Sequence, residues 1–579
     1  VIDENNSMIR PTFSYAYDIF GNVITSIDSK GFITIKSYNL RGDPTKISYP
    51  DGSFELFKYD TEGSLHRSLT RDQIITVYEY DYLGRSIYEE VSTAGEKGVA
   101  SFSLSRSHQY NGFRCIYEKE DTHIKRYYFD SVGRPTSIIE YGSGQNEKSP
   151  DTRHTELMYD AFGRIQQKRV WFDVGPLDYS VECLEYDLSG NIIQKRMEDA
   201  QGNILLKKCF SYDLNDQCIE EYVIENGIKT TLIQTTYNTQ REPIAYFDGS
   251  GQETKIIIDY NYQNALGQTV LKKSTINAMG VQTEIEFDAL GRISSLIKKD
   301  SFGVLLSSQR NIYDSLGNKI YEIHDKIVDG KIVDSQKTQW IYGPMGRVDE
   351  EIQAADTPLA KHTFYRYNSL GKLTSKTLSD ISTPITYTYN KEGRLRKVDV
   401  RNSEKNIYIT NRYTYDRHGN VLCATARNGK AFQRTYDSFN QVKQESIRDD
   451  EGSYTSKYTY DRKGRLKEIT LPDQSKIKYT YDAAFGRKVD RISEEGKILY
   501  THTYDTYDCQ GKLLKENQVG SIGEHEYKYD LNGQKIASKS KFINEEYSRD
   551  PLGRLLEIKS DTPKEYSYNH LSQIISEKK

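Results

Sequence analysis

The sequence is poor in the residues that build disulfide-rich, zinc-binding and membrane-spanning proteins. Its 579 residues include only six Cys, five Met and two Trp. The closest cysteines, Cys209 and Cys218, are nine positions apart and no Cys-x-x-Cys occurs, which argues against a dense disulfide scaffold and a standard zinc site. No run approaches the roughly 18 apolar residues of a spanning helix. We therefore expect no membrane span.

Motifs for catalysis and cofactor binding are also missing. No two of the ten histidines stand within ten residues of each other, so a His-Glu-x-x-His metal site does not occur, and isolated surface histidines are favoured over a site assembled across distant segments. The sequence shows no Ser-His-Asp order and no nucleophile elbow, and it has no phosphate loop or dinucleotide fingerprint. The sequence predicts a protein that is not an enzyme, with no catalytic, cofactor-binding or metal-binding residues.

The net charge and the content of apolar residues are both low. The 79 basic and 83 acidic residues give a formal net charge of −4, without a block of one sign, so a nucleic-acid partner is not expected. The hydrophobic fraction is 36% and the mean hydropathy −0.74, low for a thick packed core. This composition favours a thin sheet with water near both faces.

What the sequence does have is tyrosine, 47 of them, in a repeated frame. Tyrosines at positions 17, 38, 59 and 80 are separated by three steps of 21 residues, and the last begins Tyr80-Asp81-Tyr82-Leu83-Gly84-Arg85. A fixed period of this size indicates a repeat architecture. Units this small cannot bury a core alone and must stack on their neighbours.

Each repeat reads as a β-hairpin. In the frame around Tyr80, Asp81 suits the first position of a type I turn, and Gly84 supplies the positive φ that returns the chain to a twisted ladder as a bulge. Tyr-x-Tyr pairs such as Tyr78 and Tyr80 precede many turns, and side chains two apart share one face of a strand. A second turn follows about fourteen residues after each motif tyrosine, as at Ser29-Lys30-Gly31. Two strands and two turns fill a repeat and leave no room for a helix.

The frame runs through the whole chain. About 24 copies, some degenerate, lie between Tyr17 and Tyr568 with a mean spacing near 24 residues. We therefore predict one array over residues 1–579, with no internal domain boundary. Because Val1 is not an initiator methionine, we expect the chain to be a segment of a longer protein.

Tyr-Asp-x-x-Gly-Arg, near-ideal in Tyr159–Arg164, Phe287–Arg292 and Tyr460–Arg465, is the motif of YD repeats, and the chain from Tyr15 to Gln573 resembles the repeat region of bacterial Rhs proteins. It is also similar to the shell components of insecticidal toxin complexes and to the teneurin YD shell. The resemblance implies an all-β fold, a strip of tandem β-hairpins that spirals as an antiparallel sheet into a shell or cocoon, complete or partial.

The resemblance also implies a function. It is that of a non-enzymatic shell in a polymorphic-toxin system, which encapsulates a C-terminal toxic polypeptide and helps to deliver it. The implied partners are that toxin polypeptide, or other segments of the parent chain, and components of a secretion system or toxin complex. The implied location is secreted or on the bacterial cell surface, as part of a larger protein.

One stretch departs from the full-length Rhs pattern. Asp550-Pro551-Leu552-Gly553-Arg554 looks like the start of the closing region with its aspartate-based self-cleavage site, but another ordinary repeat follows. We therefore transfer no protease residue to this chain. The toxin is not part of it either.

Two other interpretations stay open. The tyrosine ladders and nine Gly-Arg arginines could recognise glycans or another cell's protein, so that the chain acts as an adhesion module. Alternatively, each guanidinium could cover an aromatic ring of the next hairpin or pair with a carboxylate. The balanced charge favours this second interpretation. The motif aspartates could form an array for calcium or glycosidase chemistry, but turn closure is the favoured role. The nine arginines are Arg85, Arg134, Arg164, Arg292, Arg347, Arg394, Arg465, Arg487 and Arg554.

A β-propeller is the architectural alternative. Two repeats make about 42 residues and four strands, which suits one blade. Trp171 and Trp340 are the only tryptophans, and no Trp-Asp pair occurs. The usual blade signature is therefore missing, and this fold ranks below the hairpin strip.

Overall fold

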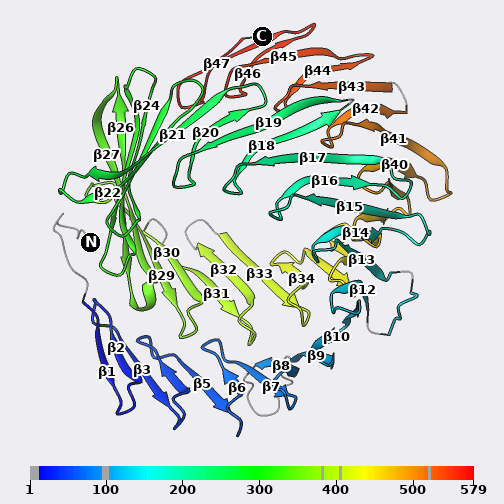
Figure 1. Ribbon diagram of the computed structural model, residues 1–579. Helices are drawn as coiled ribbons and strands as arrows, with labels where there is room; N and C mark the ends of the chain where they lie inside the picture. Colours follow the sequence, from blue (N-terminus) through cyan, green and yellow to red (C-terminus); the bar gives the residue numbers. More distant parts are fainter. Residues whose placement is uncertain are drawn as a thin grey trace. The chain divides into compact units, whose positions relative to one another are not determined.

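The chain is built almost entirely of β-strands (Figure 1). A computed structural model describes residues 12–93, 103–142, 144–149, 151–225, 227–379, 384–402, 407–519 and 523–578. The first eleven residues and Lys579 of the predicted array lie outside the described residues. Within these ranges the one helical element is a 3-10 turn, η1 (Pro344–Gly346).

The strands of the first half, in chain order, are β1 (Ser14–Tyr17), β2 (Val23–Ile27), β3 (Ile33–Tyr38), β4 (Pro44–Ser48), β5 (Phe54–Tyr59), β6 (Leu65–Leu69), β7 (Ile74–Tyr80), β8 (Ser86–Thr93), β9 (Ser103–Asn111), β10 (Arg114–Glu120), β11 (His123–Phe129), β12 (Pro135–Gly142), β13 (Arg153–Tyr159), β14 (Ile165–Trp171), β15 (Tyr179–Tyr186), β16 (Ile192–Glu198), β17 (Ile204–Tyr212), β18 (Cys218–Glu225), β19 (Ile228–Tyr237), β20 (Pro243–Asp248), β21 (Glu253–Gln263), β22 (Thr269–Ile276), β23 (Gln282–Phe287) and β24 (Ile293–Lys299).

The strands of the second half are β25 (Leu305–Tyr313), β26 (Lys319–Val328), β27 (Lys331–Tyr342), β28 (Val348–Gln353), β29 (Lys361–Tyr367), β30 (Leu373–Leu378), β31 (Ile385–Tyr389), β32 (Leu395–Asn402), β33 (Ile407–Tyr415), β34 (Val421–Ala426), β35 (Ala431–Tyr436), β36 (Val442–Arg448), β37 (Ser453–Tyr460), β38 (Leu466–Thr470), β39 (Lys476–Tyr481), β40 (Gly486–Ile492), β41 (Ile498–Tyr507), β42 (Leu513–Gln518), β43 (Gly523–Tyr529), β44 (Lys535–Ser540), β45 (Asn544–Arg549), β46 (Leu555–Lys559), β47 (Lys564–Tyr568) and β48 (Ile574–Lys578).

These strands form a single 48-stranded antiparallel sheet of hairpins, which confirms the predicted all-β fold. In β13–β14, for example, Tyr159 pairs with Ile165, and the register shifts between Met158 and Tyr159. The same shift, at the motif tyrosine, is seen at Tyr80 in β7–β8. It is the bulge predicted from the sequence. The β-propeller alternative is wrong, because its blades would be separate small sheets.

The chain divides into two compact units. Unit 1 comprises Val1–Lys125, Phe287–Leu296 and Ser307–Tyr454, and unit 2 comprises Arg126–Glu286, Ile297–Leu306 and Thr455–Lys579. Each unit therefore combines an early and a late stretch of the strip. The two units are described separately below.

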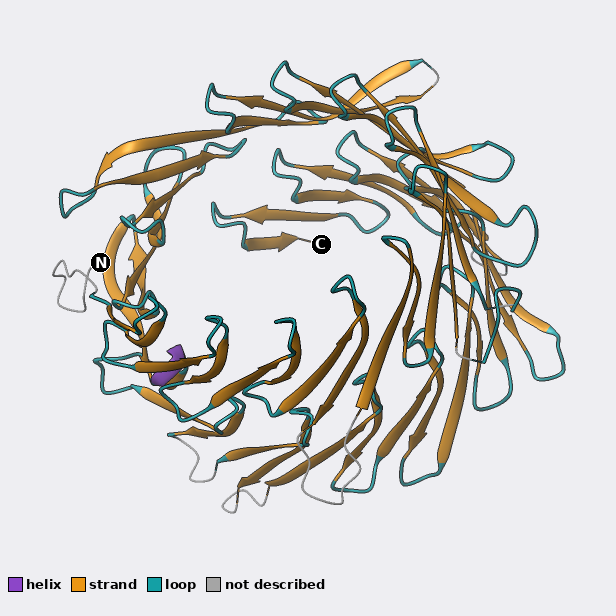
Figure 2. Ribbon diagram, turned by 60° about the horizontal axis from the view of Figure 1, so that its bottom comes forward, coloured by secondary structure: helices purple, strands orange, loops and turns teal. Residues whose placement is uncertain are grey.

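Turns lie at both ends of the strands (Figure 2). Along the chain, a turn that carries the Tyr-Asp-x-x-Gly motif (a YD turn, such as 18–22) alternates with a turn of the other kind (a second turn, such as 28–32). Because successive strands run antiparallel, all YD turns lie on one edge of the strip and all second turns on the other. The two edges thus have different chemistry.

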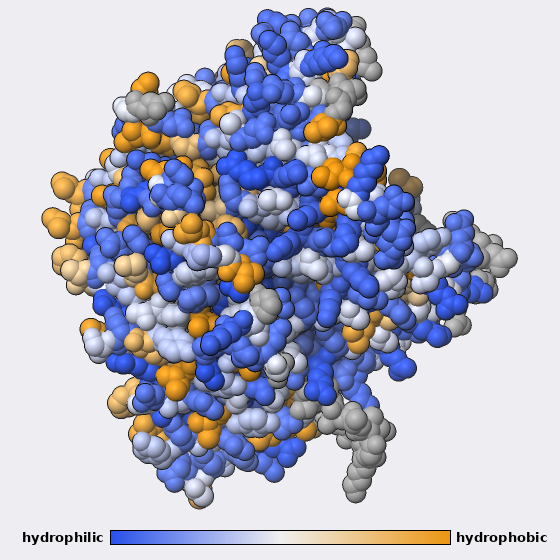
Figure 3. All heavy atoms as spheres, turned by 90° about the vertical axis from the view of Figure 1, so that its right-hand side faces the viewer, coloured by the Kyte–Doolittle hydropathy of each residue, from blue (hydrophilic) through white to orange (hydrophobic). Residues whose placement is uncertain are grey.

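The sheet is thinly covered. Among the described residues no large side chain is fully buried, and the most buried apolar positions are small ones such as Ala483, Cys183 and Val223. The face seen in Figure 3 is mostly hydrophilic, with apolar side chains in separate patches. This agrees with the low hydropathy of the sequence.

Candidate functional site

The motif aspartate closes its own turn. In the YD turn 160–164, the Asp160 N–H donates to the Arg164 carbonyl at 2.9 Å, and the Gly163 N–H donates to the Asp160 carbonyl at 3.0 Å. One carboxylate oxygen of Asp160 accepts the N–H groups of Phe162 and Arg164, both at 2.9 Å. Gly163 has a φ of +85°. The predicted turn role of the aspartate is confirmed.

Copies of the motif without glycine keep the same turn. Asp216, Arg241 and Asn440 stand in the glycine position with φ of 62°, 65° and 61°. The Asn440 N–H still donates to the Asp437 carbonyl at 3.2 Å. The left-handed backbone is therefore a property of the repeat, and glycine is its least strained occupant.

The motif arginine joins its own turn to the next repeat. Arg164 Nε donates to the Asp160 carboxylate at 2.7 Å, and its guanidinium carbon lies 4.5 Å from the ring centre of Tyr186, the next motif tyrosine. Its Nη1 also donates to the Asp187 carbonyl at 3.0 Å. The guanidinium is thus enclosed between two repeats.

The contact between guanidinium and tyrosine ring recurs at all nine Gly-Arg arginines. Each guanidinium lies 4.3–5.9 Å from the ring centre of the next motif tyrosine, which confirms the packing interpretation. The tyrosines, in the order of the arginines given above, are Tyr110, Tyr159, Tyr186, Tyr313, Tyr367, Tyr415, Tyr481, Tyr507 and Tyr568.

The motif tyrosine makes the second link between repeats. Tyr186 Oη donates to the backbone carbonyl of Ile165, in the preceding hairpin, at 2.8 Å, and burial raises the pKa of its phenol. At least eighteen motif tyrosines of the described residues make this bond, at positions 38, 59, 80, 110, 159, 186, 212, 237, 313, 342, 367, 389, 415, 436, 481, 507, 529 and 568. The ring and the hydroxyl are therefore both engaged in packing.

The pKa of several motif aspartates, among them Asp130 and Asp81, is lowered in the folded chain. Backbone N–H donation from Arg134, together with the Arg134 guanidinium, lowers the pKa of Asp130 to about 2. The side chain of Arg85 likewise lowers the pKa of Asp81. A carboxyl group held ionised in this way cannot donate the proton that glycoside hydrolysis requires. The geometry gives these residues a structural role.

In unit 1, second turns of the early stretch contact YD turns of the late stretch. Ser29 Oγ donates to Ser315 Oγ at 2.8 Å, across 286 residues of sequence. Asp51 pairs with Arg347 across 296 residues. Further contacts of this kind join Lys30 with Asp314, Asp121 with His418, and His123 with Phe439. We call this line of contacts the seam of unit 1.

Unit 2 has a seam of the same kind. Asn532 Nδ2 donates to the Asp248 carboxylate at 2.8 Å, across 284 residues, and Lys463 Nζ donates to Ser180 Oγ at 2.6 Å, across 283 residues. Burial and the charge of Arg465 lower the pKa of Lys463 to about 8. Other contacts join Asp173 with Lys467, Glu225 with Cys509, and Met279 with Arg554.

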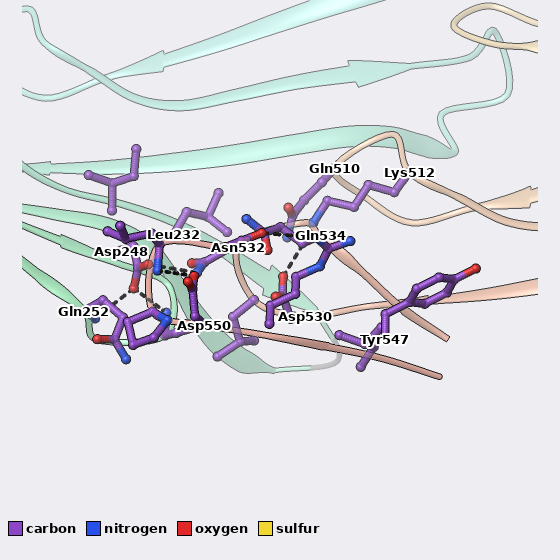
Figure 4. Close-up of a pocket in the computed structure, with 18 of the residues that line it drawn as sticks. Leu232, Asp248, Gln252, Gln510, Lys512, Asp530, Asn532, Gln534, Tyr547 and Asp550 are labelled. Carbon is purple, nitrogen blue, oxygen red and sulfur yellow. Dashed lines mark hydrogen bonds between the residues drawn. The ribbon is translucent and has the colours of Figure 1, made fainter. Parts of the chain in front are cut away.

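A polar cavity of about 740 Å³ opens along the seam of unit 2 (Figure 4). Asp248 and Asn532, joined by the bond described above, lie on its wall, and Gln510, Lys512 and Tyr547 also line it. Its surface therefore mixes carboxylate, amide, ammonium and phenol groups. This composition suits water or a hydroxyl-rich ligand better than an apolar one.

Metal ligands do not converge in the part of the chain that the structure describes. No group of three or more His, Cys, Asp or Glu side chains there is placed to hold a metal ion. Some histidines pair with a single acid, as His502 does with Glu516 at 3.0 Å, and others contact a carbonyl or a hydroxyl, as His66 and His525 do. In those same ranges, no helix has the length and apolar content to cross a membrane.

Comparison with known proteins gives a family match over part of the chain and a match of fold over most of it. Residues 253–497 match the sequence model of the family described as Teneurin YD-shell. The crystal structure of TcdB2-TccC3 without its hypervariable C-terminal region matches 98% of this chain and 33% of that chain, with a TM-score of 0.51 and 13% identity. The chain is a YD-repeat protein. It has the YD-shell fold.

Other solved structures match this YD-repeat protein less closely. TcdB2-TccC3-Cdc42 matches with a TM-score of 0.48, 12% identity, 96% of this chain and 36% of that chain. A Photorhabdus luminescens Tc holotoxin pore matches with a TM-score of 0.38, 12% identity, 98% of this chain and 42% of that chain. Our YD-repeat chain spans about a third of the length of the first solved chains it matches. No curated protein sequence matches it.

Two features of these YD repeats are not predicted from the sequence. The tyrosine hydroxyl bond to the preceding hairpin was not predicted, although the uniform Tyr-Asp frame was its signal. Contacts across about 285 residues, such as Ser29 with Ser315, were not predicted either, and the repeat spacing carries no signal for them.

Proposed function

We propose that this YD-repeat strip is part of the wall of a container that encloses a polypeptide, the toxic C-terminal segment of a larger bacterial protein. One observation carries the proposal. The chain exposes 33970 Å² of surface, whereas a compact monomer of 66.9 kDa would expose about 21,000 Å². A sheet with so much exposed surface has faces available to line a space.

The chemistry of the strip suits a passive wall. The motif side chains are engaged in contacts within and between repeats, as Asp160, Arg164 and Tyr186 are. Strand positions between them carry mainly polar side chains. A surface of this kind holds an unfolded polypeptide without reacting with it, so the proposed role is non-enzymatic.

The similarity to known proteins supports the same role. The TcdB2-TccC3 structure shares the fold of this chain, and another match is named as part of a Tc holotoxin. The proposed partners are accordingly a toxin polypeptide or other parts of the parent protein, and components of a toxin complex or secretion system. The proposed location of the parent protein is secreted or on the bacterial cell surface.

A protected reporter tests the proposal. A protease-sensitive, unfolded reporter segment is fused after Lys579, and the same segment is fused to a compact protein of similar size as the control. We expect the reporter to be digested much more slowly on the YD-repeat chain. Equal digestion rates on both carriers would overturn the container function.

X-ray scattering gives an independent check. A compact chain of 579 residues has a radius of gyration of roughly 25 Å. We expect a clearly larger value, with a distance distribution that peaks beyond that of a solid sphere. A value at the compact estimate would contradict an enclosing wall.

The cavity of unit 2 favours one second candidate, glycan binding. Asp248, Gln510 and Asn532 line it beside Tyr547, and such planar polar groups with an aromatic ring suit sugar hydroxyls. A glycan array with the native chain and with Asn532→Trp, which would place a bulky ring in the cavity and remove the amide, tests this. Binding that is absent, or unchanged by the substitution, would reject the candidate.

A further inference from the structure

In unit 1, the early YD turns expose their apolar residues almost completely. The two residues between Asp and Gly in these turns include Ile19, Leu40 and Tyr82, which are 92%, 95% and 93% exposed, and Phe20, which is 72% exposed. A YD turn needs no apolar side chain at these positions, since Ser, Thr and Lys occupy them in other copies. The row of apolar tips therefore calls for an explanation beyond the turn itself.

The late YD turns of the same unit show what covers such residues. Leu316, Leu370 and Phe439 stand in the same position of the motif as Phe20, yet each is only half-exposed or less. Phe439 lies 5.4 Å from His123, which follows a second turn of the early stretch. The seam thus covers the late YD turns with second turns.

Unit 2 repeats the contrast. The early YD turns expose Val132 by 75%, Phe162 by 79% and Leu188 by 99%. In the late turns of the same unit, Ala483 is 2% exposed and Leu552 is half-buried. In both units the early YD turns form an edge that continues the seam surface without its covering. We call these early turns the leading edge.

The chain also carries the surface that covers such an edge. Second turns of the late stretch, the trailing edge, are the counterparts of the early second turns in the seams. In unit 1 this trailing edge exposes Leu359 by 78% and the side chains of Asp356 and Asp450 by 69% and 74%. In unit 2 it exposes Phe542 by 62% and the side chain of Asp473 by 64%.

Charge favours the same pairing. In the seams, acids of second turns meet donors on or beside YD turns at Asp51–Arg347 and Asp121–His418, while the Lys30–Asp314 pair has the opposite polarity. The trailing edge offers acids again, Asp356, Asp450 and Asp473, each exposed although paired with a base of its own chain, and the leading edge offers the exposed Arg41 beside its apolar tips. The two free edges are complementary in the way the seam edges are.

We propose that the leading edge is an assembly surface that receives the trailing edge of a second copy of this chain, through the same turn-to-turn contacts that form the seams. Such an interface is heterologous, since different surfaces of the two copies meet, and further copies can add in the same direction. The inference is independent of the container function, because a chain that remains monomeric can still protect a reporter.

Sedimentation velocity on the native chain and on two edge variants tests the proposal. The leading-edge variant carries Leu40→Asp in unit 1 and Leu188→Asp in unit 2, and the trailing-edge variant carries Leu359→Asp in unit 1 and Phe542→Asp in unit 2. Each retains one intact edge. Ile257→Asp, at a half-exposed position in the middle of β21 and away from both edges, is the control for the added charge, and circular dichroism checks that all variants fold.

We expect the average mass of the native chain and of the Ile257→Asp control to rise with concentration, while each edge variant alone stays monomeric. An equal mixture of the two edge variants should form a two-chain species and nothing larger, because only one pair of edges is intact. A native chain that is monomeric at every concentration would overturn the proposal. So would edge variants that associate like the native chain, or a mixture that forms no complex.

Discussion

Arg164 and Tyr186 belong to consecutive repeats, and the guanidinium of the first lies over the ring of the second at 4.5 Å. Asp160 holds the same guanidinium from its own turn at 2.7 Å. The end of one Tyr-Asp-x-x-Gly-Arg motif is therefore a binding surface for the start of the next. A repeat in this protein is complete only when its neighbour is in place.

Removal of the Arg164 side chain in Arg164→Met should destabilise unit 2 locally by about 1–2 kcal/mol, because a cation–π contact and a partly exposed ion pair are lost. Hydrogen exchange of β14, β15 and β16 measures the local opening free energy. A double-mutant cycle with Tyr186→Leu should give a coupling of about 0.5–1 kcal/mol. Strictly additive single effects would contradict the contact.

Tyr415→Phe should destabilise β33 and β34 by about 1 kcal/mol, the usual contribution of one hydrogen bond, since Tyr415 Oη donates to the Leu395 carbonyl at 2.7 Å. The matched control is Tyr82→Phe, because Tyr82 is 93% exposed on its turn. Hydrogen exchange should show faster opening only for the first variant. Equal effects of the two substitutions would refute the structural role of the hydroxyl.

Gly84→Val should destabilise its hairpin by about 1–2 kcal/mol, because a β-branched residue is poor at a positive φ. Gly84 has a φ of +77°, and a Cβ there would meet no atom within 4 Å, so the loss reports backbone strain alone. Gly84→Asn is the milder control, as Asn440 shows in its own turn. Chemical denaturation that ranks the two variants equally would disprove the turn conformation.

Acid should destabilise the hairpins through their aspartates. The pKa of Asp130 is lowered to about 2 in the folded chain from the usual 3.8, so its contribution is present above pH 4 and is lost as the pH falls from about 4 to about 2. Asp130→Asn should flatten this part of the pH profile for β11 and β12. Proton titration by NMR gives the pKa directly, and an ordinary value would contradict the hydrogen bonds to this carboxylate.

Lys463 should make the stability of the fold depend on pH in the alkaline range. Its pKa is lowered to about 8 from 10.5, so between these values the unfolded chain binds a proton that the folded chain has lost, and stability rises with pH. Relative to Lys463→Met, the native chain should gain about 1 kcal/mol from pH 7.5 to pH 9.5, after allowance for partial exposure. A constant difference between the two proteins over this range would contradict the buried position of the ammonium group.

The repeat frame allowed the local structure to be predicted almost completely. Asp81 and Gly84 fix the turn, the alternation around Tyr78 and Tyr80 fixes which side chains share a face, and Arg85 was expected to cover an aromatic ring, which it does at Tyr110. These features depend on residues close in sequence or on the adjacent repeat. Local chemistry determines them.

The seams are beyond such prediction. Whether Asp51 meets Arg347 depends on the twist and curvature accumulated over many hairpins, and small differences at each turn decide it. No single residue encodes that sum. The positive φ of Arg241 was missed for a simpler reason, because arginine gives no hint of a left-handed conformation.

The two sides of a seam are synthesised at different times. Asp51 leaves the ribosome 296 residues before Arg347, a delay of about 15–60 s at the usual 5–20 residues per second. During that interval Asp51 and its turn have no seam partner. The nascent chain therefore exposes this edge until the late stretch has been synthesised. A chaperone that binds the chain during translation would have access to that edge.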